Sequence, residues 1–203
     1  GVSVMKFDGS NWVYVGNPSF SGTFPAHYIS LKIHNNVPYV TYKDYGAAQE
    51  ASVMMFNGTN WVNVGNPGFN NTGEVQHTKI AIDNNNVPFV AFIDVSTGFT
   101  PRVMKFNGSN WVNVGPSPYY FGGANSSTSS MSIDDNNIPY VAFRDGGNNN
   151  KETVKRFIGN TWETVGVDGF TVGQANLGSL ELDVNNNPNV AFQEPNSSLV
   201  SVM

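Results

Sequence analysis

With 203 residues, the chain carries fifteen acidic against ten basic residues, a net charge of −5, and no cysteine. The scarcity of basic residues argues against nucleic-acid binding, which needs clustered cations, and the lack of cysteine excludes disulfides and thiolate metal sites. No apolar run approaches the ~20 residues of a membrane-spanning helix, so we expect no membrane insertion.

A short motif recurs four times along the chain. In its first copy, residues 4–12, an apolar and aromatic stretch is followed by Asp-Gly-Ser-Asn and a tryptophan. The other copies are residues 53–61, 103–111 and, more loosely, 154–162, which place the tryptophans 49, 50 and 51 residues apart. A fixed period of this size is typical of repeat proteins and propellers, in which each unit packs against its neighbours.

Each repeat contains four short strand signals. In the second full repeat, residues 79–83 alternate between polar and apolar side chains, and an Asn-rich turn separates them from an apolar strand at 87–94. Residues 102–106 form a third strand, and an Asn-Gly pair predicts a tight hairpin into a fourth strand at 111–114. We therefore predict an all-β propeller of four-stranded antiparallel blades, with four repeats of about 50 residues in the chain.

The two ends of the chain carry copies of the same third strand, at residues 2–5 and 200–203. We expect a single propeller domain over residues 1–203, in which the N- and C-terminal ends share strands to close the last blade. Two alternatives stay open. In the first, the chain is a piece of a longer run of blades. In the second, two chains share blades as a homodimer.

The repeats resemble those of bacterial extracellular β-propellers, in which F-[ND]-G-x-x-W precedes a strand that reads P-[YF]-V-[AT]-[YF]-x-D. Residues 7–12 and 38–44 carry these two parts in the first unit, and nearly the whole chain follows the pattern. A weaker resemblance is to propeller lectins of the tachylectin and fucose-binding kinds. These resemblances imply a propeller at the cell surface or outside the cell, but they define no activity, because one fold hosts many functions.

An acid ends the second strand of every repeat and should lie at the same rim of every blade. These residues are Asp44, Asp94, Asp145 and Glu194. Such carboxylates accept hydrogen bonds from sugar hydroxyls or, as an alternative, ligate calcium, which prefers oxygen ligands. The competing interpretation is that they accept hydrogen bonds from loop amides in Asx turns.

An aromatic residue stands eight positions after each tryptophan, in the loop between units. These residues are Phe20, Phe69, Tyr119 and Phe170. An exposed ring beside an acid suits a sugar, because the ring stacks on the C–H faces of the sugar; the alternative is a hydrophobic plug between blades. In the third loop, Tyr119, Tyr120 and Phe121 are adjacent and cannot all be buried, so Tyr120 is a candidate as well.

Repetition of like residues around a ring is typical of binding proteins, whereas enzymes gather unlike residues at one site. We therefore predict a non-enzymatic, lectin-like module that recognises carbohydrate at inter-blade sites, without a cofactor, catalytic residues or a metal site. Its partner would be a glycan or a surface protein. The alternative hypothesis is a structural or protein-docking propeller with no small-molecule site.

Overall fold

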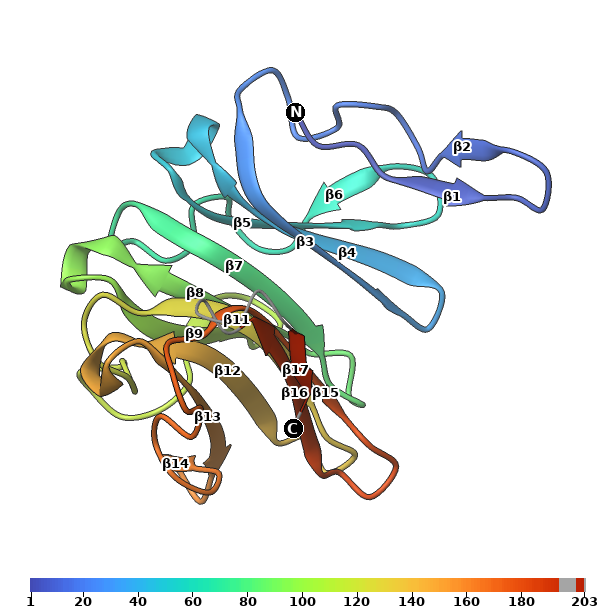
Figure 1. Cartoon of the computed structure of the whole chain (residues 1–203). Coiled ribbons are helices and arrows are strands. Elements are labelled where there is room, and N and C mark those ends of the chain that lie inside the picture. The colour runs from blue at the N-terminus through green and yellow to red at the C-terminus, as the bar shows by residue number, and fades with distance from the viewer. Residues whose placement is uncertain (194–199, 203) are drawn as a thin grey trace.

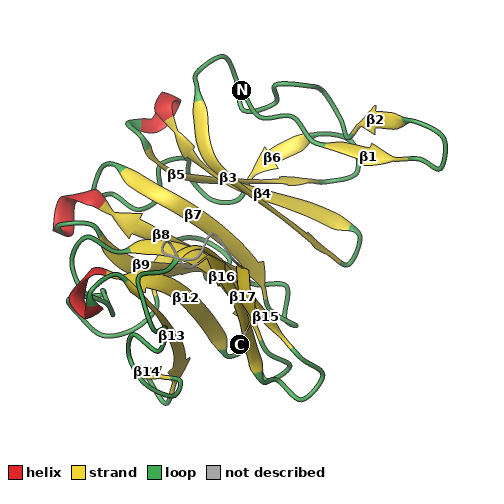
Figure 2. Ribbon diagram, in the orientation of Figure 1, coloured by secondary structure: helices red, strands yellow, loops and turns green. Residues whose placement is uncertain are grey.

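The computed structural model describes residues 1–193 and 200–202, and its backbone consists almost entirely of strands and loops (Figure 2). The helical segments of this described part are single 3-10 turns. They are η1 (Tyr45–Ala47), η2 (Val95–Thr97) and η3 (Gly146–Asn148). The prediction of an all-β chain is confirmed.

Three successive units form complete four-stranded antiparallel sheets, in which strands that follow one another in sequence pair with one another. The first sheet comprises β3 (Ala26–His34), β4 (Val37–Asp44), β5 (Glu50–Phe56) and β6 (Trp61–Asn63). The second comprises β7 (Val75–Ile82), β8 (Pro88–Asp94), β9 (Thr100–Phe106) and β10 (Trp111–Asn113). The third comprises β11 (Ser127–Ile133), β12 (Pro139–Asp145), β13 (Lys151–Ile158) and β14 (Thr161–Thr164).

Two smaller sheets flank these three. β1 (Met5–Phe7) pairs with β2 (Trp12–Tyr14) at one end of the array, and β15 (Asn176–Leu182), β16 (Pro188–Gln193) and β17 (Val200–Val202) form a three-stranded sheet at the other. The first strands β3, β7, β11 and β15 contact one another in succession. Figure 1 shows the sheets following one another along an open curve.

The predicted closure of a ring is not found. Within the described residues, β1 pairs with β2, and β17 pairs with β16 in the place that the third strand takes in the complete sheets. The second copy of the third strand therefore occupies the position that β1 would need. Over the described residues the array is therefore open. That residues 1–203 form a single domain, and that two chains share blades as a homodimer, stay predictions.

The core lies between successive sheets, where three of the four tryptophans reach back to the preceding unit. Phe69 stacks on Trp111 with ring centroids 4.1 Å apart, and the Trp111 indole Nε1 donates to the Val64 carbonyl at 2.7 Å. Phe20 stacks on Trp61 and Phe121 on Trp162 in the same way, and these indoles donate to the Val15 and Val114 carbonyls. The motif therefore supplies the same ring and the same N–H donor at three interfaces between sheets.

Candidate functional site

Each first strand contains an irregularity at the same place. Pairing with the second strand is interrupted between His27 and Ser30 in β3, and again between Gln76 and Lys79 in β7. The corresponding breaks in β11 and β15 are Thr128/Ser130 and Asn176/Ser179. A bulge redirects the side chains around it, so these strands turn polar groups toward one another where they begin.

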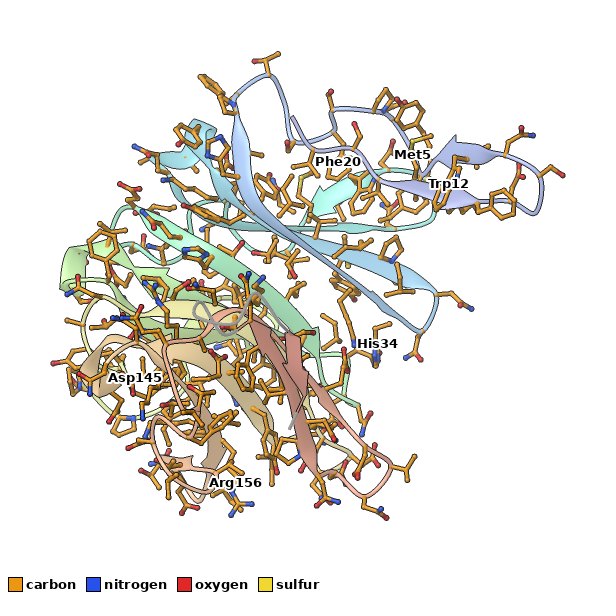
Figure 3. The ribbon with its side chains drawn as sticks, in the orientation of Figure 1. Met5, Trp12, Phe20, His34, Asp145 and Arg156 are labelled. Atoms are coloured by element: carbon orange, nitrogen blue, oxygen red, sulfur yellow. The ribbon has the colours of Figure 1, made fainter. Side chains whose placement is uncertain are left out.

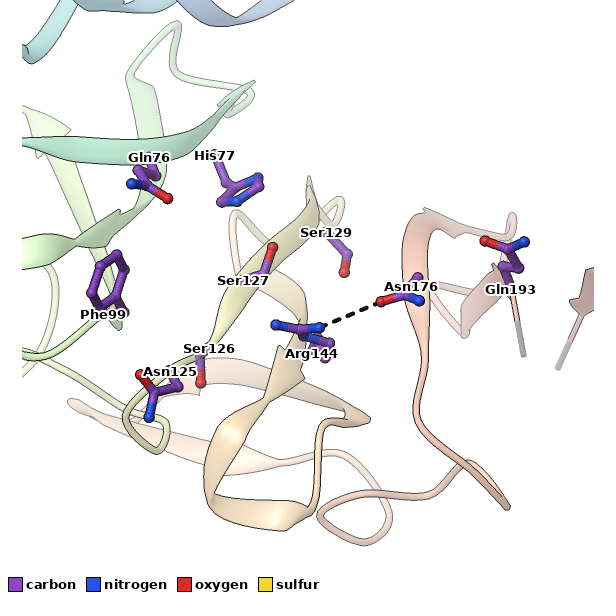
Figure 4. Close-up of a pocket in the computed structure, with 10 residues that line it drawn as sticks. All are labelled: Gln76, His77, Phe99, Asn125, Ser126, Ser127, Ser129, Arg144, Asn176 and Gln193. Carbon is purple, nitrogen blue, oxygen red and sulfur yellow. Dashed lines mark hydrogen bonds between the residues drawn. The ribbon is translucent and has the colours of Figure 1, made fainter. Parts of the chain in front are cut away.

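A pocket of about 510 Å³ lies where β7, β11 and β15 begin (Figure 4). Amide and hydroxyl side chains dominate its lining, with His77, Arg144 and the half-exposed Phe99 beside them. The polar residues include Gln76, Asn125, Ser127, Ser129, Asn176 and Gln193. Figure 4 shows Arg144 between the serines of β11 and Asn176 of β15. The pocket thus combines hydrogen-bonding groups from three sheets with one cation and one aromatic ring.

Arg144 lines this pocket, and Glu152 is its cross-strand partner between β12 and β13. The Arg144 Nη1 lies 3.5 Å from the Asn176 Oδ1, and its buried Nε has no hydrogen-bond partner among the described residues. Glu152 is fully buried, and neither carboxyl oxygen has a hydrogen-bond partner in the described part of the chain. A Cβ at Gly178 would lie 2.8 Å from the Glu152 Oε1, so only glycine lets β15 pass this close.

Burial controls the ionisation of the two titratable groups near Arg144. Burial raises the pKa of Glu152 to about 7, although the nearby Ser129 hydroxyl and the charge of Arg144 both favour the carboxylate. Burial also lowers the pKa of His77 below its ordinary value, and the charges of Lys79 and Arg144 lower it further. At neutral pH the His77 ring in the pocket is therefore neutral, and the Glu152 carboxyl, which is the buried cross-strand neighbour of Arg144 and does not line the pocket, is close to half protonated.

The buried carboxyl group predicts an unusual pH dependence of stability. A folded-state pKa above the ordinary value of 4.5 means that the stabilising proton on Glu152 is fully present below pH 4.5 and is lost as the pH rises through about 7. We expect the melting temperature to fall more between pH 5 and pH 8 in the wild type than in Glu152→Gln. Thermal unfolding of both proteins at the two pH values checks this, and equal changes would contradict it.

The structure places the predicted acids at turns rather than in an open site. Asp44, Asp94 and Asp145 are buried, and each Oδ1 accepts from the backbone N–H two residues later, at 2.8, 3.0 and 3.0 Å. The other oxygen accepts from a neighbouring strand residue: Ser52 for Asp44, Arg102 for Asp94 and Thr153 for Asp145. The contacts match the turn-capping interpretation. Glu194 lies outside the described residues.

The predicted aromatics do not form one equivalent set. Phe69 is buried and Phe20 is partly buried, each stacked on a tryptophan, and Phe170 packs edge-on against Phe192 in the last described sheet. These contacts match the hydrophobic-plug interpretation. The exposed Tyr119 is not the structural equivalent of Phe69, because Phe121 stacks on Trp162 in that place. Two extra residues in the third loop shift the equivalence, which the fixed spacing missed.

One predicted pair of residues does come together. Tyr120, 44% exposed, and Asp145 both line a shallow second pocket of about 360 Å³. Asp145 is only 2% exposed there, because the amides of Gly123 and Gly147 surround its Oδ1.

The calcium alternative requires several oxygen ligands close together. The described residues contain no group of three His, Asp or Glu side chains that could hold a metal ion.

Glu152 and Arg144 are the residues that the sequence analysis missed. The positions equivalent to Glu152 are Ala51 and Pro101, and those equivalent to Arg144 are Lys43 and Ile93. Both residues are therefore departures from the repeat, whereas the sequence analysis considered residues that the repeats share. A charged residue at a position that is apolar in the other units is the signal that could have identified Glu152.

No protein-family model and no curated protein matches the chain. Among solved structures, it is similar to a protein of unknown function from Dyadobacter fermentans, with a TM-score of 0.59 and 12% identity over 94% of this chain and 63% of that one. It is also similar to an endo-1,4-beta-xylanase from Bacteroides thetaiotaomicron, with a TM-score of 0.55 and 12% identity over 94% of this chain and 74% of that one. A third is an exo-beta-1,3-galactanase from Clostridium thermocellum, with a TM-score of 0.55 and 10% identity over 86% of this chain and 43% of that one.

These comparisons correct the prediction that the chain is not an enzyme. Two of the solved structures described above are named as a xylanase and a galactanase, so the fold is shared with enzymes that act on carbohydrate. The prediction was wrong because it assumed that repeated residues define the site. The pocket in Figure 4 is instead lined by residues that differ between the units.

Among the described residues, no helix is long and apolar enough to span a membrane.

Proposed function

We propose that this chain recognises carbohydrate, as a module of a secreted or cell-surface protein, and that the pocket between β7, β11 and β15 holds the sugar. The observation that carries the proposal is the composition of that pocket: convergent amides and hydroxyls, Arg144, and the ring of Phe99. Amides and hydroxyls exchange hydrogen bonds with sugar hydroxyls, and an aromatic ring packs against C–H faces. Solved xylanase and galactanase structures with this fold add support.

The finer architecture is part of the same proposal. Repeats of about 50 residues, four-stranded antiparallel units and contacts between successive first strands support a propeller-type array of the bacterial extracellular kind. In such an array the first strands lie nearest the axis, so a pocket between them would be axial. The inter-blade sites of the sequence prediction would then be secondary, with Tyr120 and Asp145 as the best-placed pair.

Binding to a glycan panel tests the proposal, with Asn176→Ala as the pocket variant. We expect the variant to lose about three- to tenfold in affinity, because a side-chain hydrogen bond contributes about 0.5–1.5 kcal/mol. Asn11→Ala is the matched control, since Asn11 is exposed on the β1–β2 hairpin away from the pocket. Equal losses in both variants would contradict a site in this pocket, and no binding by the wild type would contradict the proposed function.

Cleavage of the bound glycan is the second candidate function, and Glu152 is the observation that favours it. A carboxyl group with a pKa of about 7 keeps its proton near neutral pH, as a general acid must. Glu152 is fully buried and the backbone of β15 at Gly178 runs close to its carboxyl, so cleavage also requires β15 to move away there. Release of reducing ends from polysaccharides, lost in Glu152→Gln, would support this candidate, and release that persists in the variant would contradict a role for Glu152.

A further inference from the structure

The pocket contains a cation although the chain as a whole is negative. The net charge is −5, yet none of the residues that line this pocket is an acid, while Arg144 lines it. The charges of Arg144 and of Lys79, which follows His77 by two residues on β7, both lower the pKa of the His77 ring. Because the guanidinium of Arg144 has no acid beside it in the lining, the pocket favours an anion.

Arg144 forms no ion pair with the described residues, whereas several other buried or partly buried cations of the described chain do. Lys43 lies 2.5 Å from Glu74, Arg102 pairs with Asp94, and Lys155 lies 3.1 Å from Asp168. Arg144 has the buried carboxyl of Glu152 as its cross-strand neighbour, but no carboxylate of the described residues lies within 4.0 Å of its guanidinium. Its buried Nε likewise has no acceptor among them.

The shape of the arginine suits an oxyanion. A guanidinium presents parallel N–H groups that fit two oxygens of a carboxylate or of a phosphate, and among sugars a uronic acid supplies such a carboxylate. The Arg144 Nη1 donates to the Asn176 Oδ1 at 3.5 Å, and Ser127 and Ser129 on the neighbouring strand β11 also line the pocket. A sugar acid would therefore find a partner for its carboxylate and partners for its hydroxyls in one place.

We propose that the pocket selects sugars that carry a carboxylate, as uronic acids do, and that Arg144 anchors this group. The inference rests on the proposed function, because it names the class of sugar for the same pocket. Neutral sugars would use only the amides, the hydroxyls and the ring of Phe99.

Glu152 makes this selectivity depend on pH. The groups that face it are Arg144 from β12, Ser129 from β11 and Gly178 from β15, while on β7 the His77 ring is affected by the charges of both Lys79 and Arg144. With a pKa of about 7, the carboxyl is mainly neutral at pH 6 and mainly ionised at pH 8. Once ionised, it competes with the sugar carboxylate for Arg144, so affinity for an acidic sugar falls as the pH rises.

Calorimetric titration with a glucuronate oligosaccharide and with its neutral glucose counterpart of equal length tests the proposal. At pH 6 we expect the wild type to prefer the acidic sugar about tenfold or more, as charge-assisted hydrogen bonds contribute about 1.5–3 kcal/mol. Arg144→Gln should remove this preference, so that the variant binds the acidic and the neutral sugar about equally. Arg156→Gln is the matched control, because Arg156 does not line the pocket and pairs with Glu163 near the surface.

The pH dependence gives a second, independent measurement. Affinity of the wild type for the acidic sugar should fall between pH 6 and pH 8, and Glu152→Gln should show a smaller fall. Equal affinities of the wild type for the two sugars at pH 6 would overturn the inference and leave carbohydrate binding standing. If the wild type bound neither sugar, the result would count against both the selectivity for a carboxylate and the proposed carbohydrate binding. Circular dichroism of each variant confirms that it is folded, so that a loss reports on the pocket.

Discussion

Replacement of Trp111 by alanine should destabilise the protein by about 3–5 kcal/mol, as for other buried aromatic residues. The indole is 8% exposed, its ring stacks on Phe69, and its Nε1 donates to the Val64 carbonyl at 2.7 Å. The substitution removes both the ring and the donor, so it opens a cavity between two sheets and leaves a carbonyl without its partner. Urea unfolding followed by circular dichroism measures the change.

Trp12→Ala is the matched control, because it changes the same residue of the same motif. Trp12 lies on the β1–β2 hairpin at the end of the array (Figure 3) and is 67% exposed. Its replacement should lower the free energy of unfolding by less than about 1 kcal/mol, as for most exposed positions. Similar losses in the free energy of unfolding for the two variants would show that the aromatic contacts between sheets do not stabilise the protein as the structure indicates.

A comparable loss, about 3–5 kcal/mol, is expected for Arg102→Ala, because it leaves a buried charge without its partner. Arg102 and Asp94 form an ion pair in which both side chains are almost completely buried, and the Arg102 Nη2 also donates to the Asn113 Oδ1 at 2.7 Å. Asp94 would keep its bonds from Ser96 and Thr72 but would lose the opposite charge. Unfolding in urea at pH 7 measures the loss.

Arg156→Ala provides the control for this second prediction. Its ion pair with Glu163 spans 3.6 Å between side chains that are 39% and 47% exposed. An exposed pair of this kind contributes about 0–1 kcal/mol, since water screens both charges. Equal losses in the free energy of unfolding for Arg102→Ala and Arg156→Ala would contradict the prediction. They would mean that the buried ion pair adds little stability beyond the hydrogen bonds that Asp94 makes in its turn.

The strands could be predicted because their signals are local. Asn107-Gly108 marks the hairpin between β9 and β10, where Gly108 takes a φ of +98° and the Asn107 Oδ1 accepts from the Ser109 and Asn110 amides. The continuous apolar run at 88–94 becomes β8, which is buried along its whole length. These features depend on a few neighbouring residues, so the sequence reveals them without knowledge of the rest of the fold.

The roles of the repeated acids and aromatics were harder to predict, because each residue type suits two environments. Asp145 could bind a ligand or cap a turn, and the choice depends on whether loop amides such as that of Gly147 reach it first. Likewise, Phe69 becomes a plug because Trp111 of the next strand pair lies against it. The distance between such groups is set by packing between units, which no single repeat encodes.

By itself, the sequence determined the repeat, the four-stranded unit, the hairpin turns and the scarcity of charge, since these follow from composition and from short-range periodicity. Only the tertiary structure decided that the ends stay apart and that β17 takes the place of the third strand. It also brought Arg144 and Asn176 from two sheets to one pocket and placed the buried Glu152 opposite Arg144 on β13. The physical reason is that bulges and contacts between sheets set which side chains converge, and those contacts join residues about 50 positions apart in the chain.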